Sequence, residues 1–75
     1  MKYLYIFMFN KATSTTELTV NLSNGNFNTN NDINLYGIDE DKGLNYIGTV
    51  NNKPSKSSFV VSMPKWTVRL AIIEG

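Results

Sequence analysis

An unbroken apolar run occupies residues 3–9, and aromatic and aliphatic side chains alternate along it. Successive side chains of a strand point to opposite faces, so Leu4, Ile6 and Met8 share one face and the aromatic residues share the other. The aromatic residues are Tyr3, Tyr5, Phe7 and Phe9. Large exposed apolar patches are uncommon on monomeric proteins. The run therefore predicts a strand that is buried on one face by its own domain and on the other by a neighbouring subunit or partner.

The length of the chain, 75 residues, allows a single domain spanning 1–75, because two domains would each fall below the size that normally sustains a core. The sequence contains no cysteine and no histidine, which excludes disulfides and the common zinc sites. Small domains without such cross-links usually gain the missing stability by oligomerisation or by docking onto a partner. We therefore expect this chain to be stabilised by what it packs against.

Six segments have the composition and the period-two alternation of β-strands, and no segment sustains the period of a helix. The predicted strands are 3–9, 17–23, 33–38, 44–50, 59–63 and 66–73. Turn-forming residues separate them, including Asn24-Gly25-Asn26 and the polar loop 51–58. Short strands with closely spaced turn signals predict an all-β fold, a small antiparallel β-sandwich or barrel of about six strands.

Three isoleucines, Ile38, Ile47 and Ile73, add to the apolar surface that one small core cannot hide. Ile38 lies opposite the apolar stripe that Ile33 and Leu35 form on their strand. Ile73 lies opposite the stripe at the even-numbered positions of segment 66–73. The candidate interface residues are therefore Tyr3, Tyr5, Phe7, Phe9, Ile38 and Ile73.

The N-terminal segment has some features of a signal peptide, since Lys2 precedes the apolar run. The polar residues Asn10 and Lys11 follow that run directly, and no small-residue cleavage pattern is present. We therefore expect no cleaved leader, and we favour cytoplasmic synthesis or a place in a virion. No apolar run approaches the roughly 18 residues that a membrane-spanning helix requires.

The chain lacks the residues on which most enzymes of this size would rely. Without histidine, a serine nucleophile has no ordinary base, and the serines around Lys56 lie in a polar loop that offers a lysine no burial. The acidic residues Asp39, Glu40 and Asp41 lack the spacing of an EF-hand and predict an acidic hairpin tip. We expect a protein that is not an enzyme and has no catalytic residue, no metal site and no cofactor.

An alternative function follows from the distribution of charge, although the net charge is only +1. Residues 42–73 contain five basic side chains and no acidic one, with aromatic residues between them. Cations for phosphates and aromatic rings for bases are typical of proteins that bind single strands. The candidate contacts of such a nucleic-acid-binding β-barrel are Tyr46, Lys53, Lys56, Lys65, Trp66 and Arg69.

Several stretches of residues 17–75 resemble the small β-sandwich repeats of the transthyretin-like and collagen-adhesin B-type class. They are Thr-Val-Asn-Leu at 19–22, Ile-Asn-Leu-Tyr at 33–36, the acidic turn at 39–43, Tyr-Ile-Gly-Thr-Val at 46–50 and the segment 58–64. The resemblance implies a structural or adhesive module without enzymatic activity. Together with the apolar faces, it leads us to expect a structural or interaction subunit of a homo-oligomer or larger assembly, such as a virion or a cell-surface structure.

Overall fold

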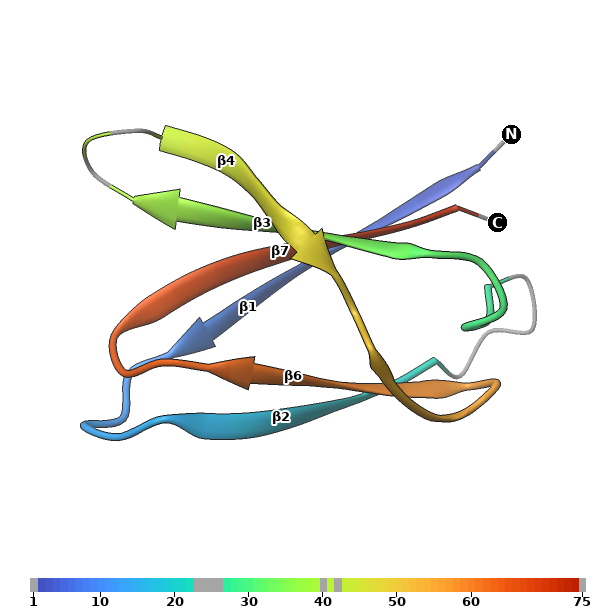
Figure 1. Cartoon of the computed structure of the whole chain (residues 1–75), viewed down its shortest axis with the longest axis horizontal. Coiled ribbons are helices and arrows are strands. Elements are labelled where there is room, and N and C mark those ends of the chain that lie inside the picture. Colours follow the sequence, from blue (N-terminus) through green and yellow to red (C-terminus); the bar gives the residue numbers. More distant parts are fainter. Residues whose placement is uncertain (1, 23–26, 40, 42, 75) are drawn as a thin grey trace.

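The computed structural model describes residues 2–22, 27–39, 41 and 43–74, and seven strands form the fold (Figure 1). The strands are β1 (Tyr3–Asn10), β2 (Thr16–Asn21), β3 (Ile33–Asp39), β4 (Gly43–Thr49), β5 (Asn52–Ser55), β6 (Ser58–Met63) and β7 (Thr67–Glu74). A larger sheet has the order β1-β7-β3-β4, and a smaller sheet has the order β2-β6-β5. All pairings are antiparallel. The predicted all-β class is confirmed, and the two separate sheets make the fold a sandwich.

One strand was not predicted, because the segment 51–58 has the composition of a loop. It contains β5, four residues that include Pro54 and pair with β6 at the border of the smaller sheet. Proline is tolerated in a border strand because its missing N–H need not enter the ladder. Pairing with β6 therefore overrides a polar sequence with no strand pattern of its own.

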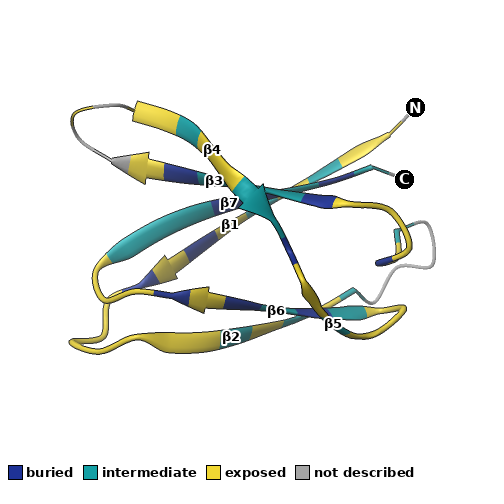
Figure 2. Cartoon of the chain, in the orientation of Figure 1, coloured by how far each residue is buried: buried dark blue, intermediate teal, exposed yellow. Residues whose placement is uncertain are grey.

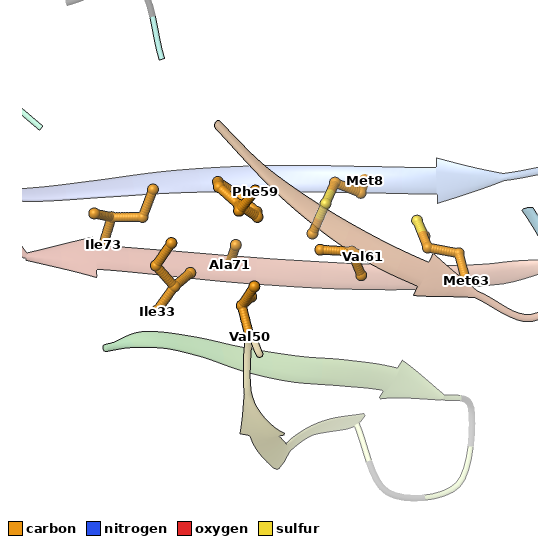
Figure 3. Close-up of a cluster of buried hydrophobic side chains, with 8 residues drawn as sticks. All are labelled: Met8, Ile33, Val50, Phe59, Val61, Met63, Ala71 and Ile73. Carbon is orange, nitrogen blue, oxygen red and sulfur yellow. The ribbon is translucent and has the colours of Figure 1, made fainter. Parts of the chain in front are cut away.

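The core lies between the two sheets and follows the alternation of the strands. Phe59, Ile33 and Ile73 are fully buried, and they pack with other aliphatic side chains of both sheets. Figure 3 shows this cluster, which consists of Met8, Ile33, Val50, Phe59, Val61, Met63, Ala71 and Ile73. The predicted division of the first strand is present, since Leu4, Ile6 and Met8 face this core.

The orientation of the last strand corrects the expectation for Ile73. This side chain is a core residue, and it pairs with Leu4 of β1 on one side and Ile33 of β3 on the other. The even-numbered stripe of β7 faces outward instead. Because β7 is an inner strand with apolar residues on both faces, its alternation does not reveal which face enters the core. Ile73 is therefore not available to a partner.

Asn10 holds together the end of the sandwich where β1 leads towards β2 and β6 leads towards β7. Its side-chain amide nitrogen donates to the carbonyl oxygens of Met63 at 2.9 Å, Pro64 at 3.1 Å and Ser14 at 3.1 Å. Its Oδ1 accepts a hydrogen bond from the backbone N–H of Ala12 at 2.9 Å. The residue is 8% exposed. One buried amide thus binds backbone groups of two connections and ties these connections to each other.

Two predicted turns fall partly or wholly outside the described residues. The turn Asn24-Gly25-Asn26 lies outside them, and so does Glu40 of the predicted acidic tip. The hairpin itself is confirmed, because β3 pairs with β4 up to Asp39 opposite Gly43. Gly43 has a φ of 66°, a left-handed conformation that glycine adopts without steric cost.

Candidate interaction surface

The side of the larger sheet that faces away from the core carries three rows of side chains, each crossing all four strands. The central row is Phe7, Leu70, Tyr36 and Tyr46. The rows on either side are Phe9, Val68, Ile38 and Leu44, and Tyr5, Ile72, Asn34 and Thr49. We call these twelve residues the outer face. It contains no charged side chain, and Asn34 and Thr49 are its polar members besides the tyrosine hydroxyls.

The outer face exposes large apolar side chains over an area comparable to the largest apolar patches of monomeric proteins. Tyr5 is 58% exposed, Phe7 57% and Phe9 63%, and Tyr46 and Leu44 on β4 are exposed to a similar extent. Figure 2 shows exposed residues along β1 alternating with half-buried and then buried ones. With 150–250 Å² for each aromatic side chain, the exposed apolar area is roughly 500 Å². The largest apolar patches of typical monomers span about 300–600 Å² and often have a function.

The centre of the outer face is already ordered by contacts within the chain. The rings of Tyr36 and Tyr46 form an edge-to-face pair with centroids 5.6 Å apart. Leu70 lies between Phe7 and Tyr36 in the central row, and only 5% of it is exposed. Such pairs fix ring orientations before any partner arrives, which lowers the entropic cost of binding.

The structure brings together most of the predicted interface residues. Tyr5, Phe7, Phe9 and Ile38 belong to the outer face, and Tyr3 lies beside it at 49% exposure. Sequence reasoning missed the contributions of β7 and of Tyr36, Leu44 and Tyr46. The alternation of Val68, Leu70 and Ile72 marks an apolar face of β7, but it does not show that this face points away from the core.

The predicted nucleic-acid contacts do not form one surface. Lys53 lies on β5, where its Nζ donates to the carbonyl oxygen of Asn31 at 3.1 Å, and Lys56 lies in the turn between β5 and β6. Lys65 and Trp66 lie in the turn at the other end of β6. The strand β6 has six residues, so the two turns are roughly 20 Å apart. The remaining two residues are on different faces of the larger sheet. Tyr46 is on the outer face, and Arg69 is on the opposite side of β7.

Trp66 and Arg69 both line a groove of about 760 Å³, together with Gly37, Asn45 and Ile47 among other residues. Arg69 donates from Nη1 to the carbonyl oxygen of Val68 at 3.1 Å. The buried Oδ1 of Asn45 accepts no hydrogen bond within the described part of the chain. The groove thus joins two of the six predicted nucleic-acid contacts and leaves the nucleic-acid hypothesis a prediction.

Trp66 has a left-handed backbone conformation, with a φ of 54°, although its side chain is bulky. This side chain is 67% exposed. This conformation costs a residue with a large side chain about 1–2 kcal/mol, and asparagine adopts it more readily. We expect Trp66→Asn to raise the free energy of unfolding by about 1 kcal/mol, measured by urea denaturation with circular dichroism. Lys65→Asn, one position earlier, is the control and should give no gain. Equal stability of the two variants would contradict strain at Trp66.

Three other findings concern the site. The described residues contain no cluster of acidic side chains placed to hold a metal ion. None of them belongs to a helix long and apolar enough to span a bilayer. Comparison with known proteins finds no matching family model, no similar curated protein and no similar solved structure, so the resemblance to transthyretin-like repeats stays a prediction.

Proposed function

We propose that this chain is a structural subunit, not an enzyme, that associates with further copies of itself through the outer face. The observation that carries the proposal is the continuity of that face, since apolar rows cross every strand of the larger sheet and no charged residue interrupts them. Protein interfaces are depleted of charge at their centre and enriched in aromatic residues. The outer face has this composition from one edge of the sheet to the other.

The area of the outer face supports a second copy as the partner. Two such faces packed together would remove roughly 1,000 Å² of apolar surface from water, which reaches the lower bound for a specific interface. An uncharged apolar face is also complementary to itself, because two copies related by a two-fold axis bring no like charges together. Burial there supplies the stability that disulfides or metals supply in other small domains.

A charge placed at the centre of the outer face tests the proposal. We expect Phe7→Lys to weaken self-association by about thirtyfold or more, because a lysine at an apolar hot spot costs roughly 2 kcal/mol or more. The matched control is Thr19→Lys, which adds the same charge at an exposed position of β2 in the smaller sheet. Sedimentation velocity over a range of concentrations measures both variants against the wild type, and circular dichroism verifies that they are folded.

Two results would contradict the proposal. The first is an equal effect of Phe7→Lys and Thr19→Lys on association, which would show that the outer face is not the contact. The second is a folded wild-type monomer whose tryptophan fluorescence changes on adding a single-stranded oligonucleotide, with an affinity that falls with salt. That result would favour the nucleic-acid hypothesis.

A further inference from the structure

Among the sheet edges that the described residues form, the border strand β1 is the one that carries no protection against pairing with another chain. Within the described residues, β7 pairs with β1 along its whole length on one side, and no strand lies on the other. The strand has eight residues with no proline, no glycine and no charged side chain. Its register with β7 runs from Tyr3 opposite Glu74 to Asn10 opposite Thr67 without a bulge. Such a long, regular, apolar edge is a template for strand addition.

The other three edges are protected by the means that natural β-proteins use. On β4, the register shifts at the pair Leu35 and Tyr36, where Ile47 is the extra residue and Gly48 has a φ of 136°. The edge strand β5 is four residues long and contains Pro54. The edge strand β2 carries the charged residue Glu17. The contrast identifies β1 as the edge at which another strand can add.

We propose that β1 pairs antiparallel with β1 of a second copy, so that two larger sheets join into one continuous sheet. The inference rests on the proposed self-association and adds a second contact, at the edge of the sheet and separate from the outer face. Both contacts together give an assembly larger than a dimer, in which joined sheets stack through their outer faces.

The alternation of β1 makes the strand complementary to itself. With Ile6 opposite its copy, Tyr5 lies opposite Phe7 and Leu4 opposite Met8 of the second chain. Aromatic residues then meet aromatic residues on the outer face, and aliphatic residues meet aliphatic residues on the core side. Cross-strand pairs of these kinds stabilise antiparallel sheets, and the absence of charge avoids repulsion between the copies.

The core side of β1 also leaves apolar area for a second copy to cover. Leu4 and Ile6 pack against the core but are only partly buried, whereas Met8 further along the strand is 3% exposed. A paired strand would lie directly beside these two side chains, because adjacent strands are about 4.8 Å apart. Addition of a second β1 therefore completes burial on both faces of the strand, which a stacked outer face alone would not do.

Hydrogen exchange of the β1 amides tests this pairing. In a free edge strand every second N–H points away from β7, whereas in a paired strand all of them are bonded. We expect the outward-pointing amides of residues 4–9 to exchange at least about tenfold more slowly above the association midpoint than below it. If these amides exchange at the rate of free peptide groups while the wild-type protein is associated, β1 does not pair with a second copy. That result would overturn edge pairing but not the proposed contact through the outer face. A wild-type monomer at every concentration would overturn both.

A second variant separates edge pairing from any slowing of exchange by general burial. Ile6→Lys places a charge next to its own copy on the core side of the edge, where the long side chain can still reach water in the monomer. We expect this variant to lose the concentration-dependent protection of the β1 amides but to keep association through the outer face. Thr19→Lys, at an edge of the smaller sheet, should keep both. Full protection in a folded Ile6→Lys protein would contradict the pairing.

Discussion

Replacing Phe59 by alanine is expected to lower the free energy of unfolding by about 3–5 kcal/mol. Phe59 is fully buried and is the largest side chain of the core, where it lies between β6 and the strands of the larger sheet (Figure 3). Its removal loses the transfer free energy of the ring and leaves a cavity that a tightly packed sandwich cannot close. Small domains have total stabilities near the low end of about 5–15 kcal/mol, so the monomeric variant should be largely unfolded at ordinary temperature.

Urea denaturation followed by far-UV circular dichroism measures this effect. Tyr46→Ala is the matched control, because it removes a ring of similar size from a side chain that is 57% exposed. At concentrations where the chain is monomeric, we expect the control to lose less than half as much stability as Phe59→Ala. Equal losses would mean that the outer face is as buried as the space between the two sheets, which would contradict the assignment of the core.

The second large effect is expected for Asn10→Asp, which should cost about 2–4 kcal/mol. The substitution keeps the shape of the side chain and an acceptor for the Ala12 N–H, but it removes the donor that reaches the carbonyl oxygens of Met63, Pro64 and Ser14. These oxygens would then face a buried carboxylate that cannot donate to them, although the hydroxyls of Thr67 and Thr16 still donate to the oxygens of Pro64 and Ser14. Leaving buried polar groups unsatisfied costs more than the hydrogen bonds contribute when they are present.

The same substitution at an exposed strand residue provides the control. Asn21→Asp changes an exposed side chain at the end of β2 and should alter the free energy of unfolding by no more than about 0.5 kcal/mol. Thermal or urea unfolding at neutral pH compares the two variants. A loss for Asn10→Asp no larger than that for Asn21→Asp would contradict the role of this amide in joining the two connections.

The parts of the fold that were predicted correctly are those with a local signal. The alternation at residues 3–9 predicted both the strand and its two apolar faces, and Leu4, Ile6 and Met8 do face the core. The alternation of segment 17–23 likewise agrees with the structure, since Leu18 and Val20 pack against the core while Glu17, Thr19 and Asn21 are exposed. Alternation between apolar and polar residues indicates which face of a strand is buried, even when the neighbouring strands are not known.

The parts that were missed depend on residues far away in the sequence. Ile73 was assigned to a partner because β7 is apolar on both faces, and only its pairing with Leu4 and Ile33 decides that it is core. The partners of Asn10 include carbonyl oxygens 53 and 54 positions away, so no local pattern marks this residue. The short strand β5 forms because β6 lies beside it.

The absence of internal cross-links and the exposed apolar area of the outer face occur in the same small chain. A chain of 75 residues without cysteine buries one apolar layer between its sheets and exposes a second layer on the larger sheet. The first layer defines the sandwich, and the second is the area that a further copy would cover in the proposed assembly. In that proposed assembly β1 contributes to both layers and, through its outer edge, to the joining of sheets.

Sedimentation equilibrium of the wild-type chain tests self-association through the outer face. We predict a concentration-dependent mass of a dimer or larger assembly, which falls toward smaller species in Phe7→Lys and is unchanged in Thr19→Lys. A single species with the mass of the monomer at all concentrations, with the circular dichroism spectrum of a folded β-protein, would contradict self-association through the outer face.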